Sequence, residues 1–297
     1  MAEDAVVGIV SQLWRFPVKS MAGERLEAAP LTAQGVLGDR AYGLIDVQSG
    51  KVVSAKSAKS FPGLLACRAE FVEPPQAGRD MPAVRITLPD GQVVTSDAAD
   101  ADRALSAHFG RAVRLARAAP EDFTIDQYHP DVAHADPGGH RDTVVEQKLG
   151  AAFFRQAGME SPLAEGSFKD LFPMSVMTTS TLRRLAELRP ESRFDVRRFR
   201  MNVIVETAEA GFAENEWVGA QLRFGDGARL VVALPDPRCV MTTLAQGDLP
   251  RDVEVIRTLT LHNRLPIADA GQFPCAGVYA VVTAPGIVRV GDAAALG

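Results

Sequence analysis

Short apolar runs that are rich in β-branched residues and end at glycine, proline or aspartate dominate this sequence. Runs of this length and composition are typical of β-strands. We predict strands over residues 5–18, 84–88, 203–207, 222–224, 230–234 and 278–282. Residues 89–92 (PDGQ) and 225–227 (GDG) each lie between two such runs and predict hairpin turns. Many short strands with few helices favour a β-barrel over an alternating βαβ sheet.

Helical periodicity is confined to a few segments. Apolar residues recur at helical spacing over residues 100–109, 143–158, 181–188 and, more weakly, 252–262. The polar segment 127–142 contains two prolines and two glycines, so we place a domain boundary there. The expected fold class is therefore mainly β with some α.

Composition indicates an ordinary globular protein and excludes several functions. The 297 residues carry a net charge of -5, whereas proteins that neutralise nucleic-acid phosphates are usually basic, so we expect no nucleic-acid partner. Apolar runs of about five residues fall far short of the ~20 that span a bilayer, so we expect no membrane association. The acidic start lacks the features of a signal peptide. The three cysteines exclude a disulfide scaffold and predict reduced thiols and a cytoplasmic location.

A lysine and an arginine follow chain breakers near the N-terminus. Residues 16–20 (FPVKS) end a predicted strand at Lys19 and Ser20, and residues 35–40 (GVLGDR) follow. Glycines at 35 and 38 permit a tight backbone that lets Arg40 reach an anionic ligand. The alternative is a surface lysine and an Arg40 paired with Asp39.

Four hydroxyl residues, 178–181, precede the predicted helix 181–188. One caps the helix, and together with the positive helix end they predict an anion site that includes Thr178 and Thr181. Residues 193–202 hold four arginines, and arginine forks suit phosphate. The alternating apolar residues there equally suit a strand with a solvated basic edge.

Cys239 follows an apolar strand and a double-proline loop, residues 235–237. Adjacent Arg238 favours the thiolate, which is the form that acts as a nucleophile or metal ligand. Zinc is not expected at Cys239, because the sequence has no Cys-x-x-Cys pair. Cys67 is interpreted as a buried apolar residue, and Cys275 as either a core residue or a redox partner.

Histidines and aspartates cluster between residues 129 and 140. The members of this cluster are His129, Asp131, His134, Asp136 and His140. Their spacing matches no helical or hairpin ligand pattern, so a mobile linker is favoured over a metal site. Trp14 and Trp217 are interpreted as core anchors.

Six segments in order resemble one family: residues 16–20, 38–40, 178–182, 199–205 (FRMNVIV), 238–243 (RCVMTT) and 286–292. They are similar to MOSC proteins with an N-terminal MOSC β-barrel domain, relatives of the molybdenum cofactor sulfurase C-terminal domain and of the mitochondrial amidoxime-reducing component. The resemblance implies an N-terminal MOSC β-barrel domain over residues 1–135, which contributes its first strand and the Lys19 and Arg40 loops to the site. A MOSC domain over residues 140–297 would form the β-barrel core.

This resemblance implies a molybdenum cofactor, a pyranopterin dithiolene with a terminal phosphate. Cys239 stands where reductase members have the cysteine that ligates molybdenum, and would be both catalytic and the metal ligand. The family's cofactor-binding positions correspond to Lys19, Ser20, Arg40, Thr178, Thr181, Arg200, Asn202, Arg238 and Tyr279. The chain departs from the family at Met201, where proline is common, and at Pro237, where a polar residue is common.

The activity implied is reduction of N-hydroxylated or N-oxygenated small molecules. No cysteine cluster of ferredoxin type follows the barrel, so an external electron donor of reductase, ferredoxin or cytochrome type is expected. One alternative is a sulfur carrier or sulfurtransferase that uses a Cys239 persulfide. Another is a non-catalytic carrier of the molybdenum cofactor.

Overall fold

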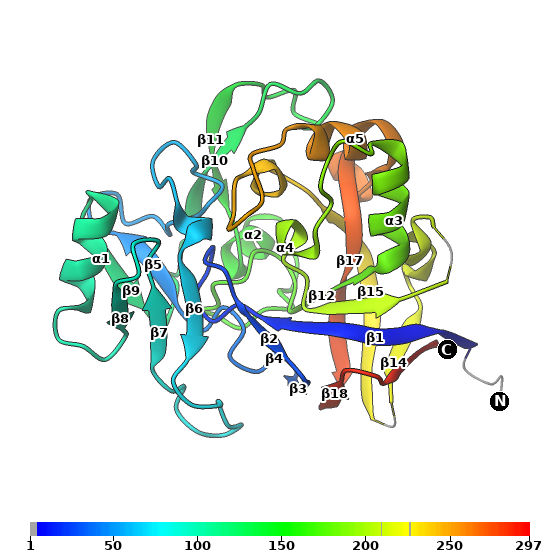
Figure 1. Ribbon diagram of the computed structural model, residues 1–297, viewed down its shortest axis with the longest axis horizontal. Coiled ribbons are helices and arrows are strands. Elements are labelled where there is room, and N and C mark those ends of the chain that lie inside the picture. The colour runs from blue at the N-terminus through cyan, green and yellow to red at the C-terminus, as the bar shows by residue number, and fades with distance from the viewer. Residues whose placement is uncertain (1–4, 209, 226) are drawn as a thin grey trace.

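A closed barrel of seven strands forms the larger part of the protein. The computed structural model describes residues 5–208, 210–225 and 227–297. Around the barrel the strands follow the order β12 (Met174–Thr178), β13 (Val203–Glu206), β1 (Ala5–Arg15), β19 (Ala293–Leu296), β14 (Gln221–Phe224), β15 (Ala228–Pro237) and β17 (Gln272–Ala284). Pairing of β12 with β17 closes the ring, which lies on the right in Figure 1. The barrel prediction is confirmed.

Alternating burial along the strands builds the barrel interior. In β14, Leu222 and Phe224 are fully buried while their neighbours are partly exposed, as a strand with one face on a core requires. Val10 and Leu13 of β1 join the same apolar cluster. The first strand therefore belongs to the same closed sheet as strands of the C-terminal half. β12 and β13 pair in parallel, and the other neighbours in the ring pair antiparallel.

Smaller sheets make a second apolar core beside the barrel, on the left in Figure 1. These sheets are β5 (Gly43–Asp46) with β9 (Val113–Ala116), and β6 (Arg68–Phe71) with β7 (Val84–Thr87) and β8 (Val93–Thr95). A further sheet of β3 (Ala28–Thr32), β4 (Gly35–Val36) and β18 (Gly286–Arg289) packs its buried residues against the barrel core instead. Helix α1 (Ala101–Phe109) covers β8 and β9 and ends before Gly110, as predicted. The turn at residues 89–92 joins β7 and β8, which confirms that hairpin.

The remaining elements are short. They are β2 (Glu24–Leu26), η1 (Leu64–Ala66), β10 (Thr124–His129), β11 (Thr143–Lys148), α2 (Ala151–Gln156), α3 (Thr179–Leu188), α4 (Val196–Phe199), η2 (Ala213–Trp217), η3 (Val240–Thr243), α5 (Glu254–His262), β16 (Arg264–Pro266) and η4 (Ala268–Ala270). The predicted helices at 181–188 and 252–262 are thereby confirmed. The predicted turn at 225–227 lies between β14 and β15, but residue 226 is outside the described residues.

The prediction of one helix over residues 143–158 is wrong in its first half. Residues 143–148 form β11, which pairs along its whole length with β10. The β-branched residues there suit this pairing. The helix starts only after Gly150, whose φ of 62° is not compatible with a helix extending back through it. The polar segment 127–142 begins inside β10 and continues as the loop of this hairpin.

Among the described residues, no helix is long and apolar enough to span a membrane.

Candidate functional site

A cationic cavity lies where the two cores meet. It contains about 810 Å³ of space free of protein atoms, part of it open to solvent. Among the described residues, seven cationic side chains line it: Lys19, Lys56, Lys169, Arg40, Arg198, Arg200 and Arg238. The carboxylates in its wall are those of Asp39, Asp170 and Asp236. The positive charges therefore outnumber the negative ones, which suits an anionic ligand.

Lys19 leaves β1 through the loop at 16–20 and reaches the cavity wall. Its Nζ donates to the Phe168 carbonyl at 2.9 Å and forms an ion pair with Asp170. Lys56 pairs with the other oxygen of Asp170 at 2.8 Å. Burial lowers the pKa of Lys19 to about 8. Burial also disfavours the Asp170 carboxylate, but the charges of the two lysines outweigh it and hold the pKa of Asp170 well below its ordinary value.

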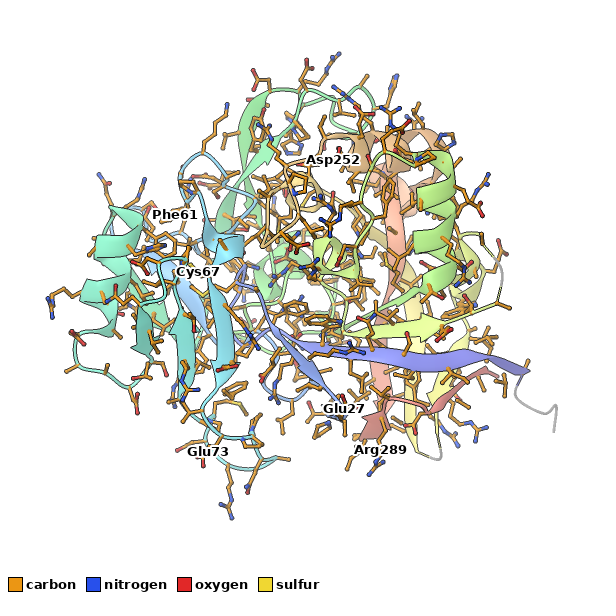
Figure 2. All side chains as sticks on the ribbon, viewed as in Figure 1. Glu27, Phe61, Cys67, Glu73, Asp252 and Arg289 are labelled. Atoms are coloured by element: carbon orange, nitrogen blue, oxygen red, sulfur yellow. The ribbon has the colours of Figure 1, made fainter. Side chains whose placement is uncertain are left out.

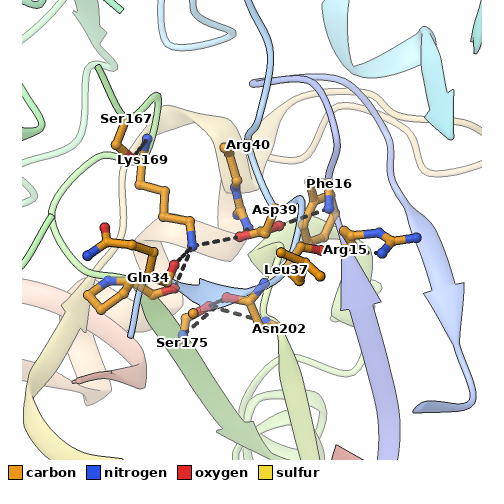
Figure 3. Close-up of polar contacts among 12 residues, drawn as sticks. Arg15, Phe16, Gln34, Leu37, Asp39, Arg40, Ser167, Lys169, Ser175 and Asn202 are labelled. Carbon is orange, nitrogen blue, oxygen red and sulfur yellow. Dashed lines mark hydrogen bonds and ion pairs between the residues drawn. The ribbon is translucent and has the colours of Figure 1, made fainter. Parts of the chain in front are cut away.

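Ser20 and Arg40 adopt left-handed backbone conformations beside Lys19, with φ of 67° and 53°. Ser20 Oγ accepts from the Ala55 amide at 3.0 Å. Arg40 pairs with Asp39 at 2.5 Å, as one of the two alternatives had it, and also lines the cavity. Figure 3 shows Asp39 between Arg40 and Lys169. Burial lowers the pKa of Lys169 to about 8.

Arg200 is the least neutralised cation of the site. It follows α4 with a φ of 56°, and its Nη1 donates to the Met21 carbonyl at 2.7 Å. Its Nη2 is buried and has no hydrogen-bond partner among the described residues. Burial, together with the charge of Arg40, lowers the pKa of Arg200 to about 9. A buried donor without a partner is costly, so this one marks a position for a ligand oxygen.

Asn202 stands two residues further along. Its Oδ1 accepts from Ser175 Oγ at 3.2 Å and its Nδ2 donates to the Trp14 carbonyl at 3.3 Å. Figure 3 shows the contact between Asn202 and Ser175 below Arg40 and Asp39. Both side chains line the cavity.

The end of β15 supplies the opposite wall. Arg238 donates to the carbonyls of Phe199 and Ala276, each at 2.8 Å, and to Asp236 at 2.5 Å. Burial raises the pKa of Asp236 to about 6 although Arg238 and Tyr279 oppose the shift. Burial and the charge of Asp236 raise the pKa of Tyr279 well above its usual value.

Cys239 is half-buried in this wall, immediately before η3. Lys56 lines the same cavity as Cys239. Burial lowers the pKa of Lys56, but contributions from Asp170 and Cys239 outweigh burial and raise that pKa overall. Arg198 donates to the carbonyls of Thr242 and Pro250, at 3.2 and 2.8 Å, and so fixes the segment that follows the thiol.

Thr178 and Thr181 do not reach the cavity. Thr178 caps α3 by accepting from the Thr181 amide at 3.2 Å, as expected. Both hydroxyls donate to the buried carboxylate of Glu214, at 2.5 and 2.7 Å, and the Gly277 amide donates to it at 3.0 Å. Because both hydroxyls are hydrogen-bonded to Glu214 inside the protein, neither threonine lines the cavity.

The segment 193–202 is not a strand edge. It forms α4, because Asp195 caps a helical turn by accepting from the Arg197 amide at 2.9 Å. Arg193 and Arg197 pair with exposed Asp248, at 2.7 and 2.6 Å, away from the cavity. Only Arg198 and Arg200 of this segment line it.

Sequence reasoning missed Lys56, Lys169 and Asp170. Lys56 lies in a polar run with no recognisable pattern, and the other two follow a loop without a motif. Asp236 lies in residues 235–237, which the sequence predicted as a double-proline loop but which form the end of β15 and pair with β17. Its place just before Cys239 was the available signal.

The other cysteines belong to the core. Cys67 is fully buried, as expected, and Figure 2 labels it within the N-terminal core. Burial raises its pKa to about 11. Cys275 is also fully buried, and burial raises its pKa to about 12. Trp217 joins the barrel core and Trp14 packs against a second cluster, which confirms both as core anchors.

For the histidine and aspartate cluster, the sequence favoured a mobile linker over a metal site, and the structure brings three of its side chains together. His129, Asp136 and His140 offer ligand atoms that all lie within 4.8 Å of one another, because β10 and its hairpin loop fold them together.

Comparisons with known proteins find sequence relatives over nearly the whole chain. The mitochondrial amidoxime-reducing component 1 of Homo sapiens is 26% identical to this chain, over 96% of the chain and 82% of that protein. The protein of the same name from Xenopus laevis is also 26% identical, over 96% and 81%. The YuaD protein of Bacillus subtilis covers 98% of this chain and 95% of its own, with 11% identity and a TM-score of 0.44.

Two family models match in succession. The MOSC N-terminal beta barrel domain matches residues 7–122, and the MOSC domain matches residues 164–295. The second match contains Arg200, Asn202 and Cys239, and the first contains Lys19 and Arg40. With both models matched in this order, the chain belongs to the MOSC proteins that carry an N-terminal MOSC β-barrel domain.

Proposed function

We propose that this protein is an oxidoreductase that uses a molybdenum cofactor to reduce N-hydroxylated or N-oxygenated small molecules. The observation that carries the proposal is the cationic cavity with a thiol in its wall. Relatives named amidoxime-reducing component support the reaction class.

The residues present fit a phosphate-bearing pterin. The unpartnered Nη2 of Arg200 is a ready donor for an anionic oxygen. Lys19, Arg40 and Lys169 surround the same space, and burial lowers the pKa of both lysines to about 8. An anion would restore their charge and offset the cost of burial. We therefore assign the phosphate to this side of the cavity.

Cys239 fits the metal end of the cofactor. Thiolate ligands suit a soft metal, and Cys239 is the cysteine that remains half-exposed while Cys67 and Cys275 are buried. Arg238 and Arg198 hold the segments before and after the thiol through carbonyl contacts. When bound, the cofactor would supply two-electron oxygen-atom transfer chemistry.

The side chains of the cavity can supply the protons of this reaction. Reduction of an amidoxime breaks its N–O bond, takes up two electrons and two protons, and releases water. Asp236, Lys19 and Lys169 line the cavity with pKa values of about 6, 8 and 8, so they can hold protons near neutral pH. The electrons must come from a separate donor of reductase, ferredoxin or cytochrome type.

The test is elemental and pterin analysis of the full chain produced in a host that makes the cofactor. The wild type and a Cys67→Ala control should contain molybdenum and pterin, and should reduce an amidoxime with an artificial donor. Cys239→Ser should keep the pterin and lose molybdenum or activity. A wild-type protein without molybdenum or pterin overturns the proposal. A persulfide trapped on Cys239 of the metal-free protein would favour sulfur transfer instead, and bound cofactor without turnover would favour a carrier.

A further inference from the structure

The hairpin of β10 and β11 gathers three metal-ligating side chains outside the cavity. His129 ends β10, and Asp136 and His140 lie in the loop that returns the chain to β11. Their ligand atoms lie within 4.8 Å of one another. The residues that line the cationic cavity do not include them. We propose that His129, Asp136 and His140 bind one divalent cation of the zinc type, separately from any cofactor in the cavity.

The carboxylate stands between the two imidazoles. One oxygen of Asp136 lies 2.7 Å from His140 Nδ1, and the other lies 3.6 Å from His129 Nδ1. Tetrahedral zinc with bonds of about 2.0–2.2 Å separates its ligand atoms by about 3.3 Å. The separations in the cluster reach 4.8 Å, so its widest pair would close by up to about 1.5 Å on a metal, with most of the movement in an exposed loop. A fourth position would be left to water.

His129 is the anchor of the site. Its side chain is 6% exposed, and both of its polar contacts among the described residues are long. These are the 3.6 Å contact with Asp136 and a 3.5 Å contact between its Nε2 and Gln127 Nε2. A buried imidazole without a close hydrogen bond is stabilised more by binding a metal than an imidazole that already has a hydrogen-bond partner.

Gly138 is required for the loop to close on its own side chains. A Cβ at this position would lie 2.9 Å from Cε1 of His140 and 3.0 Å from both Asp136 Oδ2 and His140 Nδ1. Only a residue without a side chain leaves these ligand atoms where they are. The loop is therefore shaped around the cluster.

Two imidazoles and one carboxylate select for borderline first-row cations rather than for calcium or magnesium, which prefer all-oxygen sites. Zinc is the chosen occupant because its tetrahedral geometry needs three protein ligands and one water. The ion would join the end of β10 to the tip of the loop. A Cβ built on Gly271 would lie 2.8 Å from Pro137, so the same loop is packed against the residues before β17.

The experiment is titration of the full chain with zinc against a chromophoric chelator, followed by cobalt substitution and visible spectroscopy. The wild type should bind one zinc ion and give a tetrahedral cobalt spectrum. His140→Ala and Asp136→Asn should each weaken zinc binding by more than about 100-fold. Gly138→Ala keeps all three ligands and should weaken zinc binding by about 10–100-fold, as substitutions of residues next to metal ligands typically do.

Two matched controls should bind zinc like the wild type. His134→Asn changes an exposed histidine of the same loop and keeps its φ of 64°, which asparagine tolerates. Cys239→Ser removes the cavity thiol. The proposal is overturned if the wild type binds no zinc, if the ligand variants bind it as tightly, or if Cys239→Ser abolishes binding. None of these outcomes depends on the molybdenum cofactor.

Discussion

Arg40 donates a hydrogen bond from its Nη2 to the backbone carbonyl of Arg200 at 3.1 Å. Both residues adopt left-handed backbone conformations, and both guanidinium groups lie over the ring of Phe16, at 4.5 and 4.3 Å from its centroid. Two like charges are thus held side by side, and Asp39 is the carboxylate that pairs directly with one of them, Arg40. Such an arrangement lowers the stability of the ligand-free protein, and binding of an anion should recover that stability.

Inorganic phosphate should stabilise the cofactor-free protein through Arg200. At a concentration 100 times its Kd, a ligand adds about 2.7 kcal/mol, and each kcal/mol raises Tm by about 2 °C in a chain of this size. Arg200→Gln should lose most of this rise. Arg197→Gln, which alters a pair with Asp248 outside the cavity, should keep it. Scanning fluorimetry at constant ionic strength measures the rise in Tm with phosphate. An equal rise in the wild type and both variants would refute the assignment of the phosphate to Arg200.

The stability of the cofactor-free protein should increase between pH 8 and 9. Lys19 and Lys169 have folded pKa values of about 8, below the 10.5 of the unfolded chain, so the unfolded state binds more protons in this window. Each lysine should contribute about 1 kcal/mol. Above pH 9 the raised pKa values of Cys67 and Cys275 act in the opposite direction. Urea unfolding at several pH values measures the slope, and Lys169→Met should reduce it by about half.

Asp170→Asn should destabilise the fold, because it leaves Lys19 and Lys56 without their shared partner. Breaking a fully buried ion pair costs about 3–5 kcal/mol. The Asp170 side chain is 27% exposed, so we expect about 2 kcal/mol. Asp248→Asn, at an exposed pair, should cost under about 1 kcal/mol. A loss at Asp170 no larger than that at Asp248 would show that the two lysines do not depend on it.

Gly277→Ala should be more damaging than an ordinary glycine substitution. Its φ is 76°, and a Cβ there would lie 2.2 Å from Met201 Cε and 2.8 Å from the Val176 carbonyl. Gly91→Ala is the control, since it has a similar φ of 87° but open space around it. We expect about 1 kcal/mol for the control and about 3 kcal/mol or more for Gly277. Similar losses in thermal unfolding would mean that Met201 moves aside freely.

The sequence predicted the barrel because strand signals are local. Runs such as 230–234 combine β-branched residues with flanking breakers, and the structure extends that run to β15 at both ends. Residues 143–148 were misassigned to a helix, because their pairing with β10 depends on contacts that periodicity does not report.

The cavity was predictable only where motifs surround a residue. Lys19, Arg40, Arg200 and Cys239 stand next to glycines, prolines or other arginines, and all of them line the cavity. Lys56 and Asp170 carry no such context and meet only in the folded chain. The hydroxyls of Thr178 and Thr181 suggested an anion site, but the buried carboxylate that accepts from them, Glu214, is remote in sequence. Spacing likewise concealed the proximity of His129 to His140, since a hairpin loop brings them together.

The position of β1 between β13 and β19 governs the order in which the molecule can be assembled. On a ribosome, residues 5–15 emerge first, yet one of their partner strands, residues 293–296, emerges only after nearly all of the others. The ring cannot close until residues 293–296 have been made, so β1 must wait for one of its two neighbours in the barrel. Residues 164–295 alone would lack this strand, so the barrel is completed by a strand from the N-terminal match.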